Sequence, residues 1–329
     1  MIIFESPSLD PRWNLALEEY FFEYMDPRQS YLLLWRNRNT VVIGKNQNTA
    51  SEIDGDYVRE HDITVVRRLS GGGAVYHDDG NLNFTFITDA PEDGKIDLHR
   101  FCVPVAETLR SLGVAVEISG RNDMLVDGKK FSGNAQYVRR GRVMHHGTLM
   151  FDSDLSVLGN VLRANKEKIR SKGVASTVSR VTNLRPYLPE NVTMADFSKR
   201  LKEYFAATDS LEEYSLEDAD LKTIQRLKEE RYDTWEWNYG KFSECDWSNS
   251  ERVEGCGCIQ AQLRVENGEI RDLLLRGDFF GNGDVDELTS QLEGCRFSRE
   301  AVMERLQDIP VEYYIHRLTK EKLAELLTP

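Results

Sequence analysis

The sequence predicts an α+β fold, because stretches with the period of a strand and stretches with the period of a helix both recur along the chain. Residues 82–86 alternate apolar and polar side chains, which is typical of a strand. Residues 12–24 and 97–111 carry apolar side chains at the spacing of an amphipathic helix. Residues 240–251 are mostly polar, which indicates a boundary between domains. We therefore expect two domains, residues 1–244 and 250–329.

Local signals place further elements. Asp127-Gly128 between apolar flanks predicts a two-residue hairpin, and Thr193 with Asp196 predicts a capped helix start. Glycine, proline and polar clusters bound the other segments. The remaining expected strands cover residues 32–35, 40–44, 63–66, 114–118, 135–138, 143–151, 253–265 and 270–275, and the remaining helices cover residues 54–61, 216–231, 298–306 and 319–327.

Composition excludes several classes of protein. The chain has 329 residues, of which 40% are hydrophobic and 29% charged, as is usual for a globular protein with a sizeable core. It has no run of ~18 apolar residues that would span a membrane, and its N-terminus lacks the pattern of a secretion signal. A net charge of −13 disfavours nucleic acid as the main partner. Five scattered cysteines suit a reducing cytoplasm better than a disulfide framework.

The most informative stretch runs from Arg67 to His77 and reads Arg-Arg-Leu-Ser-Gly-Gly-Gly-Ala-Val-Tyr-His. Three consecutive glycines leave the turn without Cβ atoms, so the backbone can approach a ligand and its N–H groups can converge on an anion. Arg67 and Arg68 add positive charge and forked donors suited to phosphate or carboxylate. The stretch therefore predicts a small anionic molecule held by backbone.

Other interpretations of the glycine run are weaker. Flexible linkers are Ser/Gly repeats in polar surroundings, whereas this run lies between apolar strands. No Gly-Lys-Ser/Thr follows it, so it is not a Walker loop. A strand rather than a helix follows it, so it is not a dinucleotide-binding fingerprint.

Lys130 is a second candidate for anion binding. It lies on the strand expected after the Asp127-Gly128 turn, and we expect that strand to end at Ser132-Gly133. A lysine beside a glycine-rich turn can meet a phosphate or a carbonyl oxygen as a point charge. If Lys130 is considered alone, it is better explained as an exposed lysine on a strand edge that discourages aggregation.

Two adjacent histidines and a basic segment complete the candidates. His145 and His146 share a predicted strand, so their side chains point to opposite faces, and no third ligand lies at zinc-like spacing. We expect one to line a site and the other to be structural or exposed. Residues 163–180 carry Arg163, Lys166, Lys168, Arg170, Lys172 and Arg180 against the single acid Glu167. Such a segment suggests an anionic ligand or an acidic docking partner, and a solvated helix face is a comparable explanation.

Taken together, these stretches resemble the lipoate–protein ligases, whose motifs run in the same order. The matching segments are Asn14-Leu15-Ala16-Leu17-Glu18-Glu19 and residues 35–37, 40–44, 67–77, 120–123, 130–133, 146–148 and 179–183, and the resemblance continues through the C-terminal module. It implies the fold shared with biotin ligases, which is a mixed β-sheet packed by helices with a small α+β accessory domain.

The resemblance implies a two-step reaction. ATP and Mg²⁺ activate the lipoate carboxylate as lipoyl-AMP, and a lysine of a lipoyl domain then displaces AMP. Lys130 would be the central catalytic residue, contacting both the acyl carboxyl and the α-phosphate. Arg68 and Lys130 would hold the two anions that must come together. Backbone N–H groups would place the nucleotide, from Gly73, Ala74, Val75 and Tyr76.

The resemblance also implies further contacts. Lys172 and Arg180 are expected to bind the adenylate, since the basic segment matches the family's adenylate-binding loop. The residues expected at lipoate are Gly72, His77 and His146, in an apolar slot between the flanking strands. Asn122, Asp123 and Ser70 are additional candidates. We expect no fixed protein ligands for a metal, although Asp123 is a candidate for Mg²⁺.

The implied role is lipoate salvage by a cytoplasmic monomer, with neither nucleic acid nor membrane as partner. The implied protein substrates are lipoyl domains of 2-oxoacid dehydrogenase acyltransferase subunits and the glycine cleavage H protein. The main alternative is an ATP-independent octanoyl or lipoyl acyltransferase. Such relatives typically use a cysteine nucleophile, and Cys102 lies on a predicted core helix outside every motif. A catalytically silent binding protein and a biotin ligase are weaker alternatives, and intact Arg68, Lys130 and glycines disfavour the former.

Overall fold

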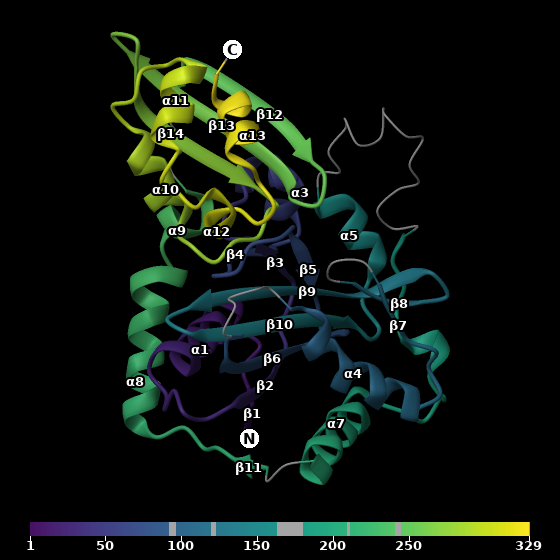
Figure 1. Ribbon diagram of the computed structural model, residues 1–329. Helices are drawn as coiled ribbons and strands as arrows, with labels where there is room; N and C mark the ends of the chain where they lie inside the picture. Colours follow the sequence, from purple (N-terminus) through teal and green to yellow (C-terminus); the bar gives the residue numbers. More distant parts are fainter. Residues whose placement is uncertain (92–96, 120–122, 163–179, 209–210, 241–244, 329) are drawn as a thin grey trace.

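Three β-sheets organise the chain, and helices cover their faces (Figure 1). The computed structural model describes residues 1–91, 97–119, 123–162, 180–208, 211–240 and 245–328. The largest sheet has eight strands in the order β11-β1-β2-β6-β10-β9-β8-β7. Two smaller sheets have three strands each, in the orders β4-β3-β5 and β12-β13-β14. The predicted α+β class is therefore confirmed.

The strands are β1 (Ile2–Glu5), β2 (Tyr31–Trp35), β3 (Thr40–Ile43), β4 (Thr64–Arg67), β5 (Val75–His77), β6 (Asn81–Asp89), β7 (Glu117–Ser119), β8 (Asp123–Val126), β9 (Lys129–Arg139), β10 (Arg142–Met150), β11 (Glu212–Glu213), β12 (Trp247–Val253), β13 (Gly257–Glu266) and β14 (Glu269–Gly277). The helices are α1 (Pro11–Glu23), α2 (Thr49–Glu52), α3 (Gly55–Glu60), α4 (His99–Ser111), α5 (Leu155–Val161), α7 (Met194–Thr208), α8 (Asp218–Leu227), α9 (Trp235–Tyr239), α10 (Val285–Leu292), α11 (Arg299–Arg305), α12 (Val311–Tyr314) and α13 (Lys320–Leu327). The 3₁₀-helix η2 (Arg185–Tyr187) and the π-helix η3 (Lys228–Tyr232) are the other elements of the described residues.

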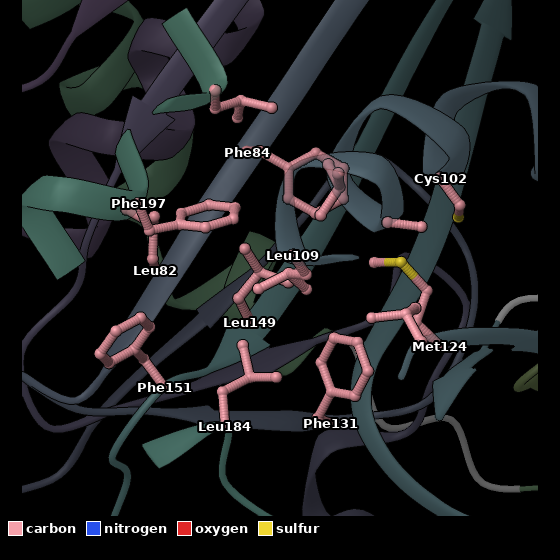
Figure 2. Close-up of a cluster of buried hydrophobic side chains, with 14 of the residues drawn as sticks. Leu82, Phe84, Cys102, Leu109, Met124, Phe131, Leu149, Phe151, Leu184 and Phe197 are labelled. Carbon is pink, nitrogen blue, oxygen red and sulfur yellow. The ribbon is translucent and has the colours of Figure 1, made fainter. Parts of the chain in front are cut away.

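The large sheet is mixed. Strand β1 pairs in parallel with β2 and β11, whereas the strands from β2 through β6, β10, β9 and β8 to β7 pair antiparallel. Both faces are covered, so every residue of β2 is buried. Leu32 and Leu34 pack into the cluster that includes α4 and α7, while Leu33 packs with α1 on the other face. Figure 2 shows the first cluster, where Phe84 of β6 lies among side chains from several elements.

The glycine run connects two strands that are not partners. Strands β4 and β5 both pair with β3, which lies between them, so the run crosses the end of β3. The predicted strands at residues 32–35 and 40–44 both form, but β2 belongs to the large sheet and β3 to the small one. The small sheet packs across β9 and β10 in Figure 1. This arrangement places the glycine run against the large sheet.

Strand β9 corrects one prediction. The hairpin at Asp127-Gly128 is confirmed, with φ of 50° and 70°, as a primed two-residue turn requires. However, the strand that carries Lys130 does not end at Ser132-Gly133, and it continues to Arg139. Ser132 and Gly133 stay in the ladder because they pair with Met124 and Asp123 of β8. The two small residues are therefore part of the strand and do not end it.

The C-terminal part forms its own core. Strands β12, β13 and β14 pair antiparallel, and helices α10 to α13 pack on them. The predicted hairpin at Asn267-Gly268 is confirmed, with φ of 54° and 81°. Strand β12 begins inside the polar stretch at residues 240–251, where we expected the domain boundary, and it ends at Val253. It was missed because the less exposed positions of this edge strand include the polar residues Asn249 and Glu251, so the sequence shows no apolar alternation.

The C-terminal part contacts the glycine run directly. A Cβ on Gly71 would lie 2.3 Å from the carbonyl oxygen of Phe279, and one on Gly72 would lie 3.1 Å from the Phe280 ring. Close by, the Gly277 N–H donates to the Asn46 carbonyl at 2.7 Å. These contacts join the loop after β14 to the loops that flank the small sheet. Among the residues that the structure describes, no helix is long and apolar enough to span a membrane.

Candidate active site

A pocket lies between the glycine loop (residues 68–74) and the large sheet. Its lining comes from α1, from strands β2, β6, β9 and β10 of the large sheet, and from the small sheet. The apolar side chains include Leu15, Trp35 and Val42, which suit a hydrocarbon tail. The other lining residues are Arg68, Gly72, Gly73, Ala74, Val75, His77, Asn83, Lys130, Gly133, Asn134, Ala135, His146, Gly147 and Thr148.

Close packing sets the shape of the glycine loop. Gly72 has a φ of +93°, which favours glycine. A Cβ on Gly44, at the end of β3, would lie 1.9 Å from the Gly72 carbonyl oxygen. In contrast, a Cβ on Gly73 would meet no heavy atom within 4 Å, so this backbone faces open space. The loop is therefore tightly packed on one side and accessible on the other.

Arg68 holds the glycine loop from inside. Its Nη2 donates to the carbonyl oxygens of Gly71 at 2.6 Å and Gly73 at 2.9 Å, and its Nε donates to Ser70 Oγ at 3.0 Å. The side chain lines the pocket although Arg68 is only 6% exposed. Burial lowers the pKa of Arg68 to about 10, so the group stays charged at neutral pH. Arg68 thus brings a fixed positive charge to the pocket wall.

Arg67 does not share this role, which corrects the prediction that both arginines offer donors to a ligand. Its guanidinium donates hydrogen bonds to acceptors within the protein. These are the carbonyl oxygens of Gly44, Lys45, Gln47, Trp237 and Asn238 and the hydroxyl of Thr49. Burial lowers its pKa to about 9. Arg67 therefore ties the loop after β3 and helix α9 to β4, and it faces away from the pocket lining.

Lys130 lines the pocket from β9. Its Nζ forms an ion pair with Asp123 Oδ1 at 2.7 Å, across the β8–β9 hairpin. Both side chains are about one-third exposed, at 34% and 36%. The pair holds the ammonium at the pocket while leaving it open to a ligand.

The two adjacent histidines divide as the strand period predicts. His145 is buried among Phe84 and Phe101 on the core face, and burial holds its pKa well below the usual range. His146 lies on the other face and lines the pocket. The Nε2 of His146 lies 2.6 Å from Ser70 Oγ, and its Nδ1 lies 3.0 Å from Glu18 Oε1.

His77 lines the pocket in a neutral form. Burial, with the nearby charge of Arg68, lowers its pKa to about 3. Asn14 Nδ2 lies 2.7 Å from the Arg36 carbonyl oxygen and 3.0 Å from Asn37 Oδ1, so Asn37 must turn its Nδ2 toward His77 Nδ1 at 3.2 Å. Because Nδ1 accepts, the ring proton lies on Nε2. That atom has no partner among the described residues.

The remaining candidates are placed as follows. The side chain of Tyr76 lies outside the lining, since its hydroxyl donates to Asn39 Oδ1 at 3.1 Å. Ser70 is buried behind the lining. Arg180 is exposed and lies next to Val181, which forms a bridge with Lys130. Asn122, Lys172 and the basic residues from Arg163 to Lys172 lie outside the described residues.

Sequence reasoning gave no role to the Glu18 carboxylate, which contacts the pocket-lining His146. It lies on the buried face of α1, and the amphipathic pattern of this helix indicated only core packing. Glu18 is 1% exposed, and Thr85 donates to it at 2.5 Å. The sequence did contain a signal for this residue, which is an acidic side chain on the apolar face of a predicted helix. Such a side chain needs polar partners when it is buried.

Residues 10–206 match the family model described as lipoyl protein ligase A/B catalytic domain, and residues 243–327 match the model of the bacterial lipoate protein ligase C-terminus. A curated relative, lipoate-protein ligase LplJ of Bacillus subtilis, is 45% identical over 97% of each chain. The chain belongs to the lipoate–protein ligase family. The resemblance inferred from the motifs is thereby confirmed.

Solved structures of lipoate–protein ligases agree with this fold. P. falciparum LipL1, solved in complex with lipoate, aligns with a TM-score of 0.77 at 24% identity, covering 98% of this chain and 97% of that one. A lipoate-protein ligase A structure bound with ATP aligns with a TM-score of 0.62 at 27% identity, covering 73% of this chain and 98% of that one. The first of these shows the fold across nearly the whole length.

Proposed function

We propose that this protein is an ATP-dependent lipoate–protein ligase that works through lipoyl-AMP. A lipoate carboxylate oxygen attacks the α-phosphorus of ATP, and the bond to the β-phosphate oxygen breaks to release pyrophosphate. The amine of an acceptor lysine then attacks the lipoyl carbonyl, loses a proton and displaces AMP. The observation that carries the proposal is the pocket, where an apolar slot meets Lys130 and the glycine loop.

The first step needs positive charge, because two anions must approach each other. Arg68 and Lys130 both line the pocket, Arg68 from the glycine loop and Lys130 from β9, so each can stabilise one anion. In the second step, negative charge develops on the carbonyl oxygen, and Lys130 can stabilise it as a mobile ammonium. The exposed backbone of Gly73 to Val75 supports the proposed nucleotide contact, and His77 and His146 support contacts with lipoate.

Asp123 fits a role beside Mg²⁺ and Lys130. Mg²⁺ usually binds through one or two carboxylates together with substrate phosphates, where it neutralises phosphate charge. The Asp123 carboxylate is accessible and lies at the pocket rim through its pair with Lys130. We propose that Lys130 turns from Asp123 to the incoming anions, which leaves the carboxylate for the metal.

Replacing Asp123 with asparagine tests this role. We expect the Mg²⁺ concentration that gives half the maximal rate of adenylate formation to rise by about tenfold, because one charged ligand is lost. Pyrophosphate exchange at fixed ATP and varied MgCl₂ measures it. An unchanged Mg²⁺ dependence, with a higher KM for lipoate instead, would restrict Asp123 to orienting Lys130.

The acceptor is proposed to be a lipoyl domain, of the 2-oxoacid dehydrogenase acyltransferase subunits or the glycine cleavage H protein, in the cytoplasm where ATP is supplied. We also propose that residues 1–244 and 250–329 are separate domains and that the protein is a monomer. The separate hydrophobic core of β12 to α13 supports the division.

ATP dependence tests the proposed reaction. Lipoate, octanoate and biotin are compared in pyrophosphate exchange, and lipoate transfer to a purified lipoyl domain is followed by mass spectrometry. We expect exchange with lipoate and no modification when ATP is omitted. Transfer from an octanoylated carrier that proceeds equally well without ATP would favour the acyltransferase.

The acyltransferase alternative lacks a cysteine nucleophile among the described residues that line the pocket. None of the cysteines is among the lining residues, and Cys102 is buried on α4. Burial raises the pKa of the Cys102 thiol to about 12, so the thiolate needed for attack is scarce. The ligase therefore remains the better supported function.

A further inference from the structure

Glu18 lies at one end of a chain of buried hydrogen bonds that reaches Arg68. The chain runs from Glu18 to His146, from His146 to Ser70, and from Ser70 to Arg68, over contacts of 3.0, 2.6 and 3.0 Å. We call these four residues the buried relay. All are buried, and they come from α1, β10 and the glycine loop. The relay therefore connects three segments that are far apart in the sequence.

The proton positions follow from the Arg68 end. The Nε–H of a guanidinium can only donate, so Ser70 Oγ accepts from Arg68. The hydroxyl proton of Ser70 is then free to point at His146 Nε2, which must accept it. If His146 were doubly protonated, Ser70 Oγ would face two donors, and its own proton would lose this acceptor.

The other end leads to the same assignment. The indole N–H of Trp35 can only donate, and it donates to Thr85 Oγ1 at 2.9 Å. Thr85 then donates its own proton to Glu18 Oε1 at 2.5 Å. A carboxylate only accepts, so His146 must also donate to Glu18 through Nδ1. His146 is thus neutral with its proton on Nδ1, the opposite tautomer to that of His77.

The relay also balances charge. Within the described part of the chain no carboxylate contacts Arg68, whose donors reach only carbonyl oxygens and Ser70 there. The Glu18 carboxylate is the anion that opposes the effect of burial on the pKa of Arg68. A buried charge without such compensation is costly and tends to move toward water. Glu18 therefore favours the position of Arg68 in which it clasps the glycine loop.

We propose that Glu18 is a positioning residue that acts through His146 and Ser70 on Arg68 and so holds the glycine loop in the shape that accepts ATP. This inference rests on the proposed function, because the nucleotide is taken to bind at that loop. Glu18 and Ser70 do not line the pocket, so they act on the ligand only through the residues between. Preorganisation of this kind lowers the cost of binding.

The first test reads the relay without any reaction. In protein labelled with ¹⁵N-histidine, a long-range ¹H–¹⁵N spectrum at neutral pH distinguishes the two tautomers of each ring. We expect His146, assigned from the signals lost in His146→Asn, to carry its proton on Nδ1, and His77 to carry its proton on Nε2. A His146 ring protonated on Nε2, or on both nitrogens, would overturn the relay whether or not the protein forms lipoyl-AMP.

The second test asks whether the relay acts as one unit on ATP. Glu18→Gln and Ser70→Ala are each expected to raise the KM for ATP about tenfold in pyrophosphate exchange, with a smaller change in the KM for lipoate. The double variant should be no worse than the single variants, because either change breaks the same chain. Losses that multiply to about a hundredfold, or an unchanged KM for ATP, would overturn the proposal.

Glu19 provides the matched control. It is the next residue of α1 and is also buried, but it pairs with Arg231 at 2.7 Å and Tyr232 at 2.8 Å, away from the pocket. Glu19→Gln should lower the melting temperature and leave the KM for ATP unchanged. A rise in the KM equal to that of Glu18→Gln would reveal general destabilisation and overturn the proposal. If Glu18→Gln does not fold, the KM for ATP of Ser70→Ala and the tautomer of His146 still test the proposal.

A Ser–His–Glu arrangement also occurs in acyl-transferring enzymes, where the serine is the nucleophile. Here Ser70 is 1% exposed and already accepts from Arg68, so positioning is the favoured role. Intact-mass measurement after incubation with lipoate and ATP should show no covalent adduct. A lipoyl adduct that disappears in Ser70→Ala would overturn the positioning role and make Ser70 a nucleophile.

Discussion

Replacing Lys130 with alanine is expected to lower the rate of adenylate formation by about a thousandfold, the upper range for losing one charged group that stabilises the transition state. Among the described residues that line the pocket, Lys130 carries the one ammonium, and Arg68 lines the same pocket. Without it, the carboxylate and the α-phosphate repel each other, and Arg68 is the one cationic group left among the described lining residues. Pyrophosphate exchange with lipoate measures this step.

The fold should survive this change, because Lys130 is 34% exposed and its pair with Asp123 is accessible to solvent. We expect the free energy of unfolding to fall by no more than about 1 kcal/mol. Lys129→Ala is the matched control, since Lys129 precedes Lys130 on β9 and is exposed. Normal exchange by Lys130→Ala would remove this residue from the mechanism, and equal losses in both variants would point to damage of the hairpin.

Much of the fold was predictable because its signals are local. The turn at Asp127-Gly128 needs only two residues with positive φ, and both have it. The start of α7 needs only Thr193 and Asp196, which bond to each other's backbone N–H groups as a capping box. The faces of His145 and His146 follow from the period of a strand.

What the sequence could not predict depends on contacts between distant segments. Arg67 and Arg68 are neighbours of the same type, but only the packing of the loop after β3 and of α9 shows that Arg67 is consumed by carbonyl oxygens. Glu18 belongs to a motif that supported the family resemblance, yet its partner His146 lies 128 residues away. The strand β12 lacks a clear apolar alternation because it forms an edge.

The packing of the glycine loop also depends on contacts that the sequence pattern does not predict. Its composition predicted close approach to a ligand, but two of the approaches that the structure shows are to protein. The carbonyl oxygen of Phe279 is too close to Gly71 to leave room for a Cβ there. The Gly72 carbonyl oxygen likewise leaves no room for a Cβ on Gly44. Only Gly73 faces open space. Part of the glycine requirement is thus internal packing, which positions the accessible backbone.

Gly44→Ala is therefore expected to damage the site from outside the loop. The new Cβ would lie 1.9 Å from the Gly72 carbonyl oxygen and 3.2 Å from Arg68 Nη2, so backbone must move. Overpacking of this kind costs about 3 kcal/mol. Because Gly72 and Arg68 both line the pocket, we also expect the KM for ATP to rise about a hundredfold, or about 2.7 kcal/mol of lost binding. Chemical denaturation and pyrophosphate exchange measure the two effects.

Gly55→Ala is the control for Gly44→Ala, since Gly55 opens α3 and its nearest neighbour to an added Cβ is Arg59 Nη1 at 3.8 Å. This variant should change the free energy of unfolding by less than about 0.5 kcal/mol and leave both KM values unchanged. A Gly44→Ala protein that loses stability but binds ATP normally would separate the packing of Gly44 from the shape of the glycine loop. In that case the close contact would serve only to hold the small sheet, and the nucleotide would depend on other groups.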